Sequence, residues 1–147
     1  MKIVVTGATA NQTRESEAMP ARNDQRPPVW VGHVYLPVQD VPSTARWLET
    51  VGLRPIVVRD EAAVLEMRGG THVVVRPGPA AGGGAPFDLM VDDIDAAHSA
   101  YAEKSLSPSP IHRGSVKARF DHDSFELLGP DGWVFTVYSS HVGDRPV

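Results

Sequence analysis

The chain has 147 residues, of which 41% are hydrophobic and 22% are charged, a composition typical of a globular protein. Its formal net charge is -4 and it carries 14 lysines and arginines without a basic run, which argues against a nucleic-acid partner. The absence of cysteine excludes disulfides, thiolate metal sites and a cysteine nucleophile. No apolar run approaches the ~20 residues that span a bilayer, and no signal peptide follows Lys2. We therefore expect no membrane partner and a cytoplasmic location.

Residues 1–29 differ in composition from the rest of the chain. The opening MKIVVTGATA resembles the first strand and turn of a dinucleotide-binding domain. However, Gly7 is followed by Ala8, whereas a phosphate-binding loop needs several glycines before its helix. The polar stretch that follows ends in two prolines, so we expect a flexible or extra N-terminal segment without a dinucleotide site.

Residues 30–77 predict a strand, a helix and three further strands. In HVYLPVQD, which begins at His33, apolar side chains alternate as they do in a strand with one buried face. Asp40 is a suitable N-cap for a helix that Gly52 would end. The runs RPIVVRD, AVLEMRG and THVVVRPG then predict a meander of three strands.

Residues 78–85 are glycine, proline and alanine, and predict a linker. Residues 86–141 then predict a second module in the same order as the first. FDLMVDD predicts a strand, a helix runs from about Ile94 to Lys104, and IHRGSVKARFD, SFELLGP and WVFTVYS predict three strands. The last two strands are joined by the turn signal GPDGW. Residues 142–147 form a short polar tail.

The two modules look like copies of one unit. At a constant offset, Leu36 matches Leu89 and Asp40 matches Asp93, and each segment has the pattern of a strand, an acidic turn and a helix. We therefore expect an α+β fold of two βαβββ modules with a pocket between the copies.

This duplicated layout resembles the vicinal oxygen chelate superfamily, which includes glyoxalase I, bleomycin-resistance proteins and extradiol dioxygenases. The resemblance covers about residues 30–140 and rests on GHVYLPVQD, MVDDIDAAHSAY and LLGPDGWVFTVY. In the last motif, Gly129 stands where the superfamily usually has Asp. The resemblance implies that the two modules form a curved mixed sheet around a concave pocket that holds a small molecule. It also implies a homodimer, with modules paired either within one chain or between two chains.

The resemblance also implies four positions at which enzymes of the superfamily hold a divalent ion. These positions fall on His33, Val74, Pro86 and Thr136, so only His33 keeps a strong metal ligand. We therefore expect no metal cofactor. The alternative is a shifted set of His33, His72 and Asp88, which would require a change of strand register.

Strand alternation predicts which side chains line the pocket. They are His33, Tyr35, Val74, Asp88, Met90, Thr136 and Tyr138. Trp30 and Trp133 lie near strand starts, where they would either pack into the protein or stack on a planar ligand.

Three functions remain open at this point. The expected one is metal-independent binding of an aromatic or hydroxylated small molecule, as in antibiotic-resistance members of the superfamily. The alternative is an enzyme: a lyase, isomerase or dioxygenase with a shifted metal set, or a metal-free catalyst using His33 and Asp88 as acid and base. The third is a regulatory or interaction subunit whose pocket is vestigial.

Overall fold

The computed structural model describes residues 25–79, 82–114 and 122–140. Almost all of the described residues belong to one compact unit, Val29–Arg145. The expectations for the first 24 residues and for the tail at 142–147 lie outside the described residues. Among the residues that are described, no helix has both the length and the apolar character to cross a membrane.

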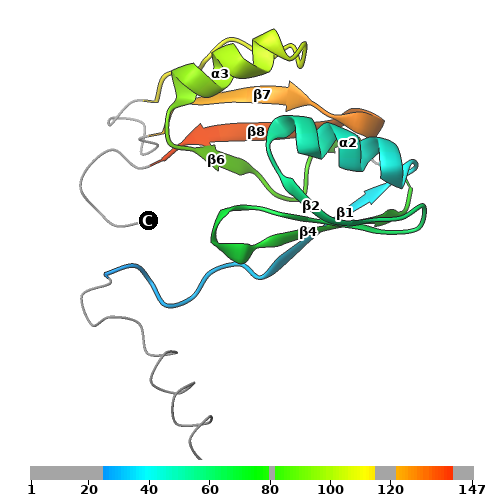
Figure 1. Cartoon of the computed structure of the whole chain (residues 1–147). Coiled ribbons are helices and arrows are strands. Elements are labelled where there is room, and N and C mark those ends of the chain that lie inside the picture. The colour runs from blue at the N-terminus through cyan, green and yellow to red at the C-terminus, as the bar shows by residue number, and fades with distance from the viewer. Residues whose placement is uncertain (1–24, 80–81, 115–121, 141–147) are drawn as a thin grey trace, which may run out of the picture. The chain divides into compact units, whose positions relative to one another are not determined.

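The first module is a four-stranded sheet with one helix (Figure 1). Its strands are β1 (His33–Val38), β2 (Arg54–Val58), β3 (Ala63–Glu66) and β4 (His72–Pro77). Their order in the sheet is β1-β4-β3-β2, with β1 parallel to β4 and the other neighbours antiparallel. The helix α2 (Val41–Val51) contacts β2, β3 and β4, and a short turn, η1 (Arg68–Gly70), joins β3 to β4.

Helix α2 begins and ends where the sequence predicts. The side chain of Asp40 accepts a hydrogen bond from the backbone N–H of Ser43 at 2.9 Å, which satisfies one of the free donors at the helix start. Gly52 ends the helix with φ 126°, a conformation that a residue with a Cβ rarely adopts. The buried positions follow helical spacing and face the sheet: Val41, Thr44, Ala45, Leu48 and Val51.

The second module is built around β8 (Trp133–Ser139). The strands β5 (Gly83–Gly84) and β6 (Leu89–Val91) both run parallel to β8, and β7 (Ser124–Leu128) pairs with it antiparallel. Because β5 and β6 pair with successive parts of β8, they act as one edge strand that is interrupted at residues 85–88. The helix α3 (Ile94–Glu103) packs against this sheet (Figure 1).

The start of α3 repeats the start of α2. Asp93 has φ -123° and ψ 101°, against φ -123° and ψ 100° for Asp40. Its side chain likewise accepts from the N–H three residues further on, that of Ala96, at 3.0 Å. The predicted repeat is therefore present in backbone geometry as well as in sequence.

The second module differs from the prediction in the strand expected directly after α3. The sequence predicts a strand over 111–121, but the described part, residues 111–114, makes only an isolated bridge between His112 and Ser124. Pro108 and Pro110 precede this bridge, and proline has no N–H to donate to a strand ladder. The remainder of the predicted strand, residues 115–121, lies outside the described residues.

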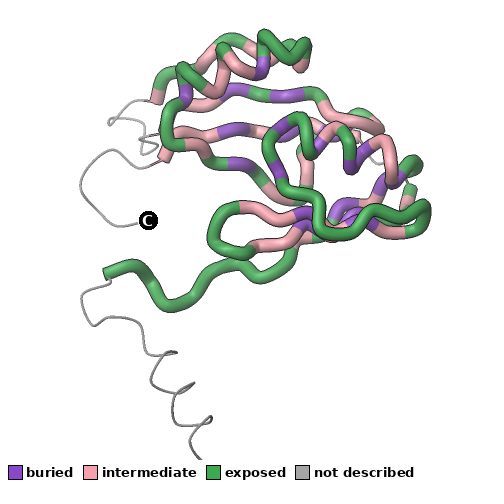
Figure 2. The backbone as a smooth tube through the Cα atoms, in the orientation of Figure 1, coloured by how far each residue is buried: buried purple, intermediate pink, exposed green. Residues whose placement is uncertain are grey.

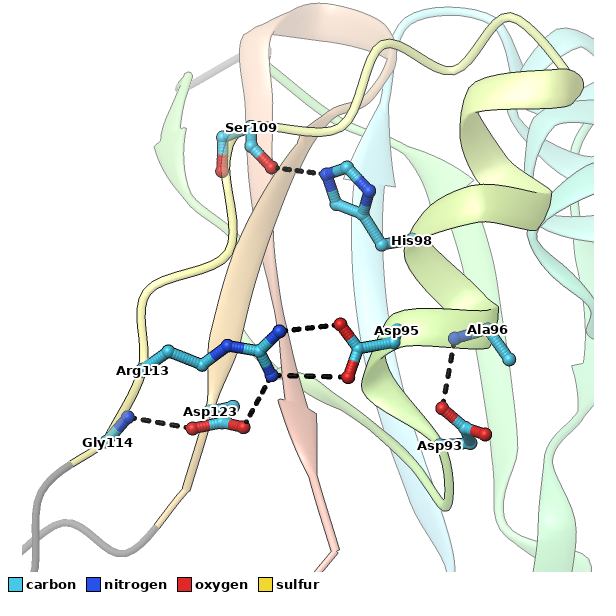
Figure 3. Close-up of polar contacts among 8 residues, drawn as sticks. All are labelled: Asp93, Asp95, Ala96, His98, Ser109, Arg113, Gly114 and Asp123. Carbon is cyan, nitrogen blue, oxygen red and sulfur yellow. Dashed lines mark hydrogen bonds and ion pairs between the residues drawn. The ribbon is translucent and has the colours of Figure 1, made fainter.

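Side chains hold this irregular segment in place of a strand ladder (Figure 3). The guanidinium of Arg113 contacts Asp95 of α3 at 2.6 Å and Asp123 at 2.9 Å. Asp123 also accepts the backbone N–H of Gly114 at 2.8 Å. These contacts lower the pKa of Asp95 and of Asp123, chiefly through the hydrogen bonds from Arg113.

The predicted linker at 78–85 also takes part in the sheet. Gly83 and Gly84 form β5 and pair with Trp133 and Val134 of β8. The composition of the linker pointed to a loop because glycine and proline are depleted in strands. Pairing with β8 outweighs that weak local preference.

The two modules share one hydrophobic core, which Figure 2 shows as buried positions along both sheets and both helices. Trp47 of α2 packs on Phe135 of β8 with ring centroids 5.1 Å apart. The indole of Trp133 is only 7% exposed and donates to the backbone oxygen of Pro37 at 2.9 Å. Trp133 is therefore a core residue, whereas Trp30 is 66% exposed. The α+β fold class is confirmed, with the strands divided between two four-stranded sheets.

Candidate functional site

The outer face of the first sheet carries one half of the predicted site. In β1 the side chains of Leu36 and Val38 are fully buried, so alternation turns His33 and Tyr35 to the opposite face. Tyr35 is 49% exposed and lies directly opposite Val74 of β4. The predicted residues of this module therefore lie side by side on an outer face where His33 and Tyr35 are exposed.

An apolar row crosses this outer face beside a row of polar side chains. The register places Tyr35, Val74, Val64 and Val57 opposite one another on the four strands. The guanidinium carbon of Arg76 lies 4.5 Å from the centre of the Tyr35 ring, a cation–π arrangement. The face thus combines aromatic, apolar and positively charged groups.

The outer face of the second sheet carries the other half of the predicted site. Phe135 and Val137 of β8 are fully buried, so Thr136 and Tyr138 point away from the core. Met90 of β6 is 52% exposed. Asp88 is also exposed and, together with Thr136, lines a cavity of about 220 Å³ at the interruption between β5 and β6.

Each of two cavities on the described residues is confined to one module. The cavity at Asp88 is lined only by the second module, and another of about 340 Å³ is lined only by the first, around Arg54, Glu66 and the η1 turn. The modules join instead through the core, on the sides of the sheets opposite to the predicted site. His33 and Asp88, the predicted acid and base, accordingly belong to different modules, with Asp88 in the interruption between β5 and β6.

The residues at the superfamily's metal positions do not fit a metal ion. Val74 and Thr136 occupy corresponding places on β4 and β8, as the sequence alignment of the two modules predicts. The side chains of Val74 and Pro86 offer no donor atom, and a neutral threonine hydroxyl is a poor ligand. In the described part of the chain, no group of three or more His, Asp or Glu side chains is arranged to hold a metal ion.

His72 lies beside His33 without any change of register. The two residues are direct partners in the parallel pairing of β1 with β4, and their ring centroids are 5.4 Å apart. Of the alternative set of His33, His72 and Asp88, the structure brings together the two histidines and leaves Asp88 in the second module, between β5 and β6.

Glu66 is a site residue that the sequence reasoning missed. It pairs with His72 across β3 and β4, and its Oε1 lies 3.8 Å from Nε2 of His72. Its other oxygen, Oε2, accepts from Nε of Arg54 at 3.0 Å, and this hydrogen bond lowers the pKa of Glu66. The signal was present in AVLEMRG, because the buried Ala63 and Leu65 place Glu66 on the opposite face.

Comparison with solved structures finds the same fold in proteins of the glyoxalase and bleomycin-resistance type. A lactoylglutathione lyase from Agrobacterium tumefaciens superposes with a TM-score of 0.62 at 15% identity, over 78% of this chain and 96% of that one. A bleomycin resistance determinant encoded on transposon Tn5 gives a TM-score of 0.61 at 16% identity, over 78% and 100%. A glyoxalase/bleomycin resistance protein from Catenulispora acidiphila gives 0.59 at 17% identity, over 77% and 100%.

These neighbours establish the fold, which this chain shares with glyoxalase and bleomycin-resistance proteins. No family model matches the sequence, and no curated protein does. The expected resemblance is confirmed at the level of architecture. At identities of 14% to 17% the neighbours carry no conclusion about ligand, metal or reaction.

Proposed function

We propose that this protein binds an aromatic or hydroxylated small molecule on the outer faces of its two sheets, without an ion at the superfamily's metal positions. The observation that carries the proposal is the chemistry of those faces. They place aromatic and apolar side chains beside a few polar groups, the combination that small-molecule sites use for affinity and orientation. Tyr35 with Arg76 on the first sheet, and Met90 with Thr136 on the second, are examples.

We further propose that a homodimer completes the site. Each chain leaves both faces uncovered, and apolar side chains such as Tyr35, Val57, Met90 and Leu128 are between 41% and 67% exposed. Exposed apolar surface of this kind usually marks a binding site or an interface. If the first sheet of one chain faces the second sheet of the other, each of two symmetric pockets receives both halves of the site.

The binding experiment uses the full chain without a tag, in buffer containing EDTA. Bleomycin and a catechol are titrated while quenching of Trp30, the exposed tryptophan, is recorded. Saturable binding that weakens in Tyr35→Ala and in Thr136→Arg supports the proposal, with Glu103→Ala on the exposed side of α3 as the control. The proposal is contradicted if neither compound binds, or if the two site variants leave the binding unchanged.

Mixing the two site variants tests whether the pocket is shared between chains. In a shared pocket, a mixed dimer of Tyr35→Ala and Thr136→Arg chains has one pocket with both faces intact. Random exchange of chains should then restore about one quarter of the wild-type sites. If each pocket belonged to one chain, mixing would restore none. Sedimentation velocity across a range of concentrations measures the dimer independently.

A further inference from the structure

Arg76, near the end of β4, is a cation on the outer face of the first sheet that no described carboxylate neutralises. Arg54, Arg68 and Arg113 each form an ion pair with an Asp or Glu side chain. The guanidinium of Arg76 instead lies over the ring of Tyr35, and no described group accepts a hydrogen bond from it. A guanidinium that stacks on an aromatic ring keeps its planar fork of N–H donors for other partners. The fork of Arg76 is therefore available to an anion from outside the described chain.

The other charges of this face leave Arg76 uncompensated. Arg54 and Glu66 neutralise each other at the opposite end of the strands. The turn at residues 59–62 contains one arginine and two acids, and neither acid forms an ion pair with Arg76. Arg76 is thus the group of this face to which an anionic ligand would be drawn.

The outer face of the second sheet has the opposite character. Asp88 is exposed there, and Glu126 of β7 is exposed as well, because its neighbours Phe125 and Leu127 are buried. The strands of this sheet contain no lysine or arginine, and the position that corresponds to Arg76 is Tyr138. An anion site is therefore a feature of the first module and does not follow from the repeat.

The spacing of side chains along β4 suits a single planar ring. The apolar row that runs through Tyr35 and Val74 crosses four strands, which lie about 4.8 Å apart, so it is about 14 Å long. Side chains on one face of a strand repeat at about 6.6 Å. A ring centred over Val74 consequently has Arg76 on one side and His72 on the other. The face offers a cation, an apolar contact and an imidazole in that order.

We infer that the ligand of this face is an aromatic carboxylate, whose carboxylate group is held by Arg76 while its ring lies on Val74. The inference rests on the proposed function and names its class of ligand. A carboxylate fits one guanidinium through two parallel hydrogen bonds. A phosphate would bring a charge of about −2, which a single unpaired arginine does not balance. A hydroxyl group opposite the carboxylate would point toward His33 and His72, whose ring centroids are 5.4 Å apart.

The test compares two ligands that differ in charge and have nearly the same shape, 4-hydroxybenzoate and 4-hydroxybenzamide. Each is titrated into the full chain at pH 7 in EDTA, and the dissociation constant is measured from amide chemical shifts by NMR. We expect the acid to bind at least about tenfold more tightly than the amide, because hydrogen bonds between charged groups are roughly twice as strong as neutral ones. The largest shifts should fall in β1 and β4.

Substitutions of Arg76 test whether this residue supplies the preference. Arg76→Gln should bring the affinity ratio of acid to amide close to one. Arg76→Lys should give an intermediate ratio, since an ammonium group keeps the charge but lacks the fork. The control is Arg46→Gln, which removes an exposed arginine of α2 and should leave the ratio unchanged. Circular dichroism of each variant checks that the fold is retained.

Equal affinity of the wild type for acid and amide, or an unchanged ratio in Arg76→Gln, would overturn the inference. Sedimentation velocity of Arg76→Gln covers the competing role of Arg76 as a contact between chains. A weaker dimer with an unchanged ratio would assign Arg76 to that contact and count against the ligand site. If catechol binds and 4-hydroxybenzoate does not, this inference alone fails. If neither bleomycin, catechol nor 4-hydroxybenzoate binds, the proposed function fails with it.

Discussion

Gly129 precedes the turn that leads into β8, and the structure explains why this position holds glycine. Its backbone, at φ -90° and ψ -177°, is extended and open to any residue, so no left-handed conformation requires glycine. The constraint is space. A Cβ built at residue 129 would lie 2.9 Å from Cε2 of Phe135 and 3.2 Å from Cη2 of Trp47. The aromatic pair thus fills the volume that a side chain at residue 129 would need.

Replacing Gly129 with alanine should therefore destabilise the protein by about 1–3 kcal/mol, the usual cost of adding a methyl group to a packed core. Phe135 is fully buried and is also in contact with Phe87, so it has little freedom to move away. For a domain of this size the melting temperature should fall by about 3–6 °C for each kcal/mol. Aspartate, which the superfamily usually has here, should cost more than alanine because it is larger and charged.

Thermal unfolding by circular dichroism measures the effect, and Gly32→Ala is the matched control. Gly32 also lacks a positive φ, and nothing lies within 4 Å of its added Cβ. Both substitutions remove a similar amount of chain entropy from the unfolded state, so their difference reports the steric term. In a double-mutant cycle, Phe135→Leu should relieve part of the cost of Gly129→Ala. Equal melting temperatures for Gly129→Ala and Gly32→Ala would refute this reasoning.

Two further predictions concern the second module. The buried hydroxyl of Tyr101 donates to the backbone oxygen of Val51 at 2.8 Å. Tyr101→Phe should therefore lower the free energy of unfolding by about 1–2 kcal/mol, with no change in its dependence on urea concentration. An unchanged midpoint of urea unfolding would contradict this prediction. Arg113 holds the pKa of Asp95 and Asp123 below their usual values, so the unfolded state takes up protons first and stability should fall as the pH drops below about 4. Arg113→Gln should lose less stability over that interval in acid titrations followed by circular dichroism, and a parallel loss in both proteins would count against the assignment.

Local sequence signals determined the elements of this fold and their order. Asp40 and Asp93 mark the two helix starts because their side chains cap free backbone donors, a relation within three residues of chain. Alternation assigned Tyr35 and Thr136 to the faces opposite the core, since side chains of a strand alternate regardless of what surrounds it. The repeat then led to the superfamily fold, which the comparison with solved structures confirms.

Tertiary pairing decided what the periodic pattern left open. The strand predicted after α3 is replaced, in its described part, by an irregular segment. Its Arg113 side chain bonds to Asp95 and Asp123, which are distant along the chain. The linker contributes β5 because β8 offers it a partner. Neither outcome could be read from propensity, which is weak beside the hydrogen bonds and ion pairs that pairing supplies.

The candidate site shows the same division. Alternation along a single strand was enough to place His33 and Tyr35 on the face opposite the core, whereas the metal positions were inferred from the resemblance to the superfamily. The sequence did not identify Glu66 as a neighbour of His72, since that contact depends on the register across the η1 turn. Nor did it decide that the modules join through their core faces and leave the two halves of the site uncovered. Register and docking are set by side chains distant in sequence, and only the folded chain brings those together.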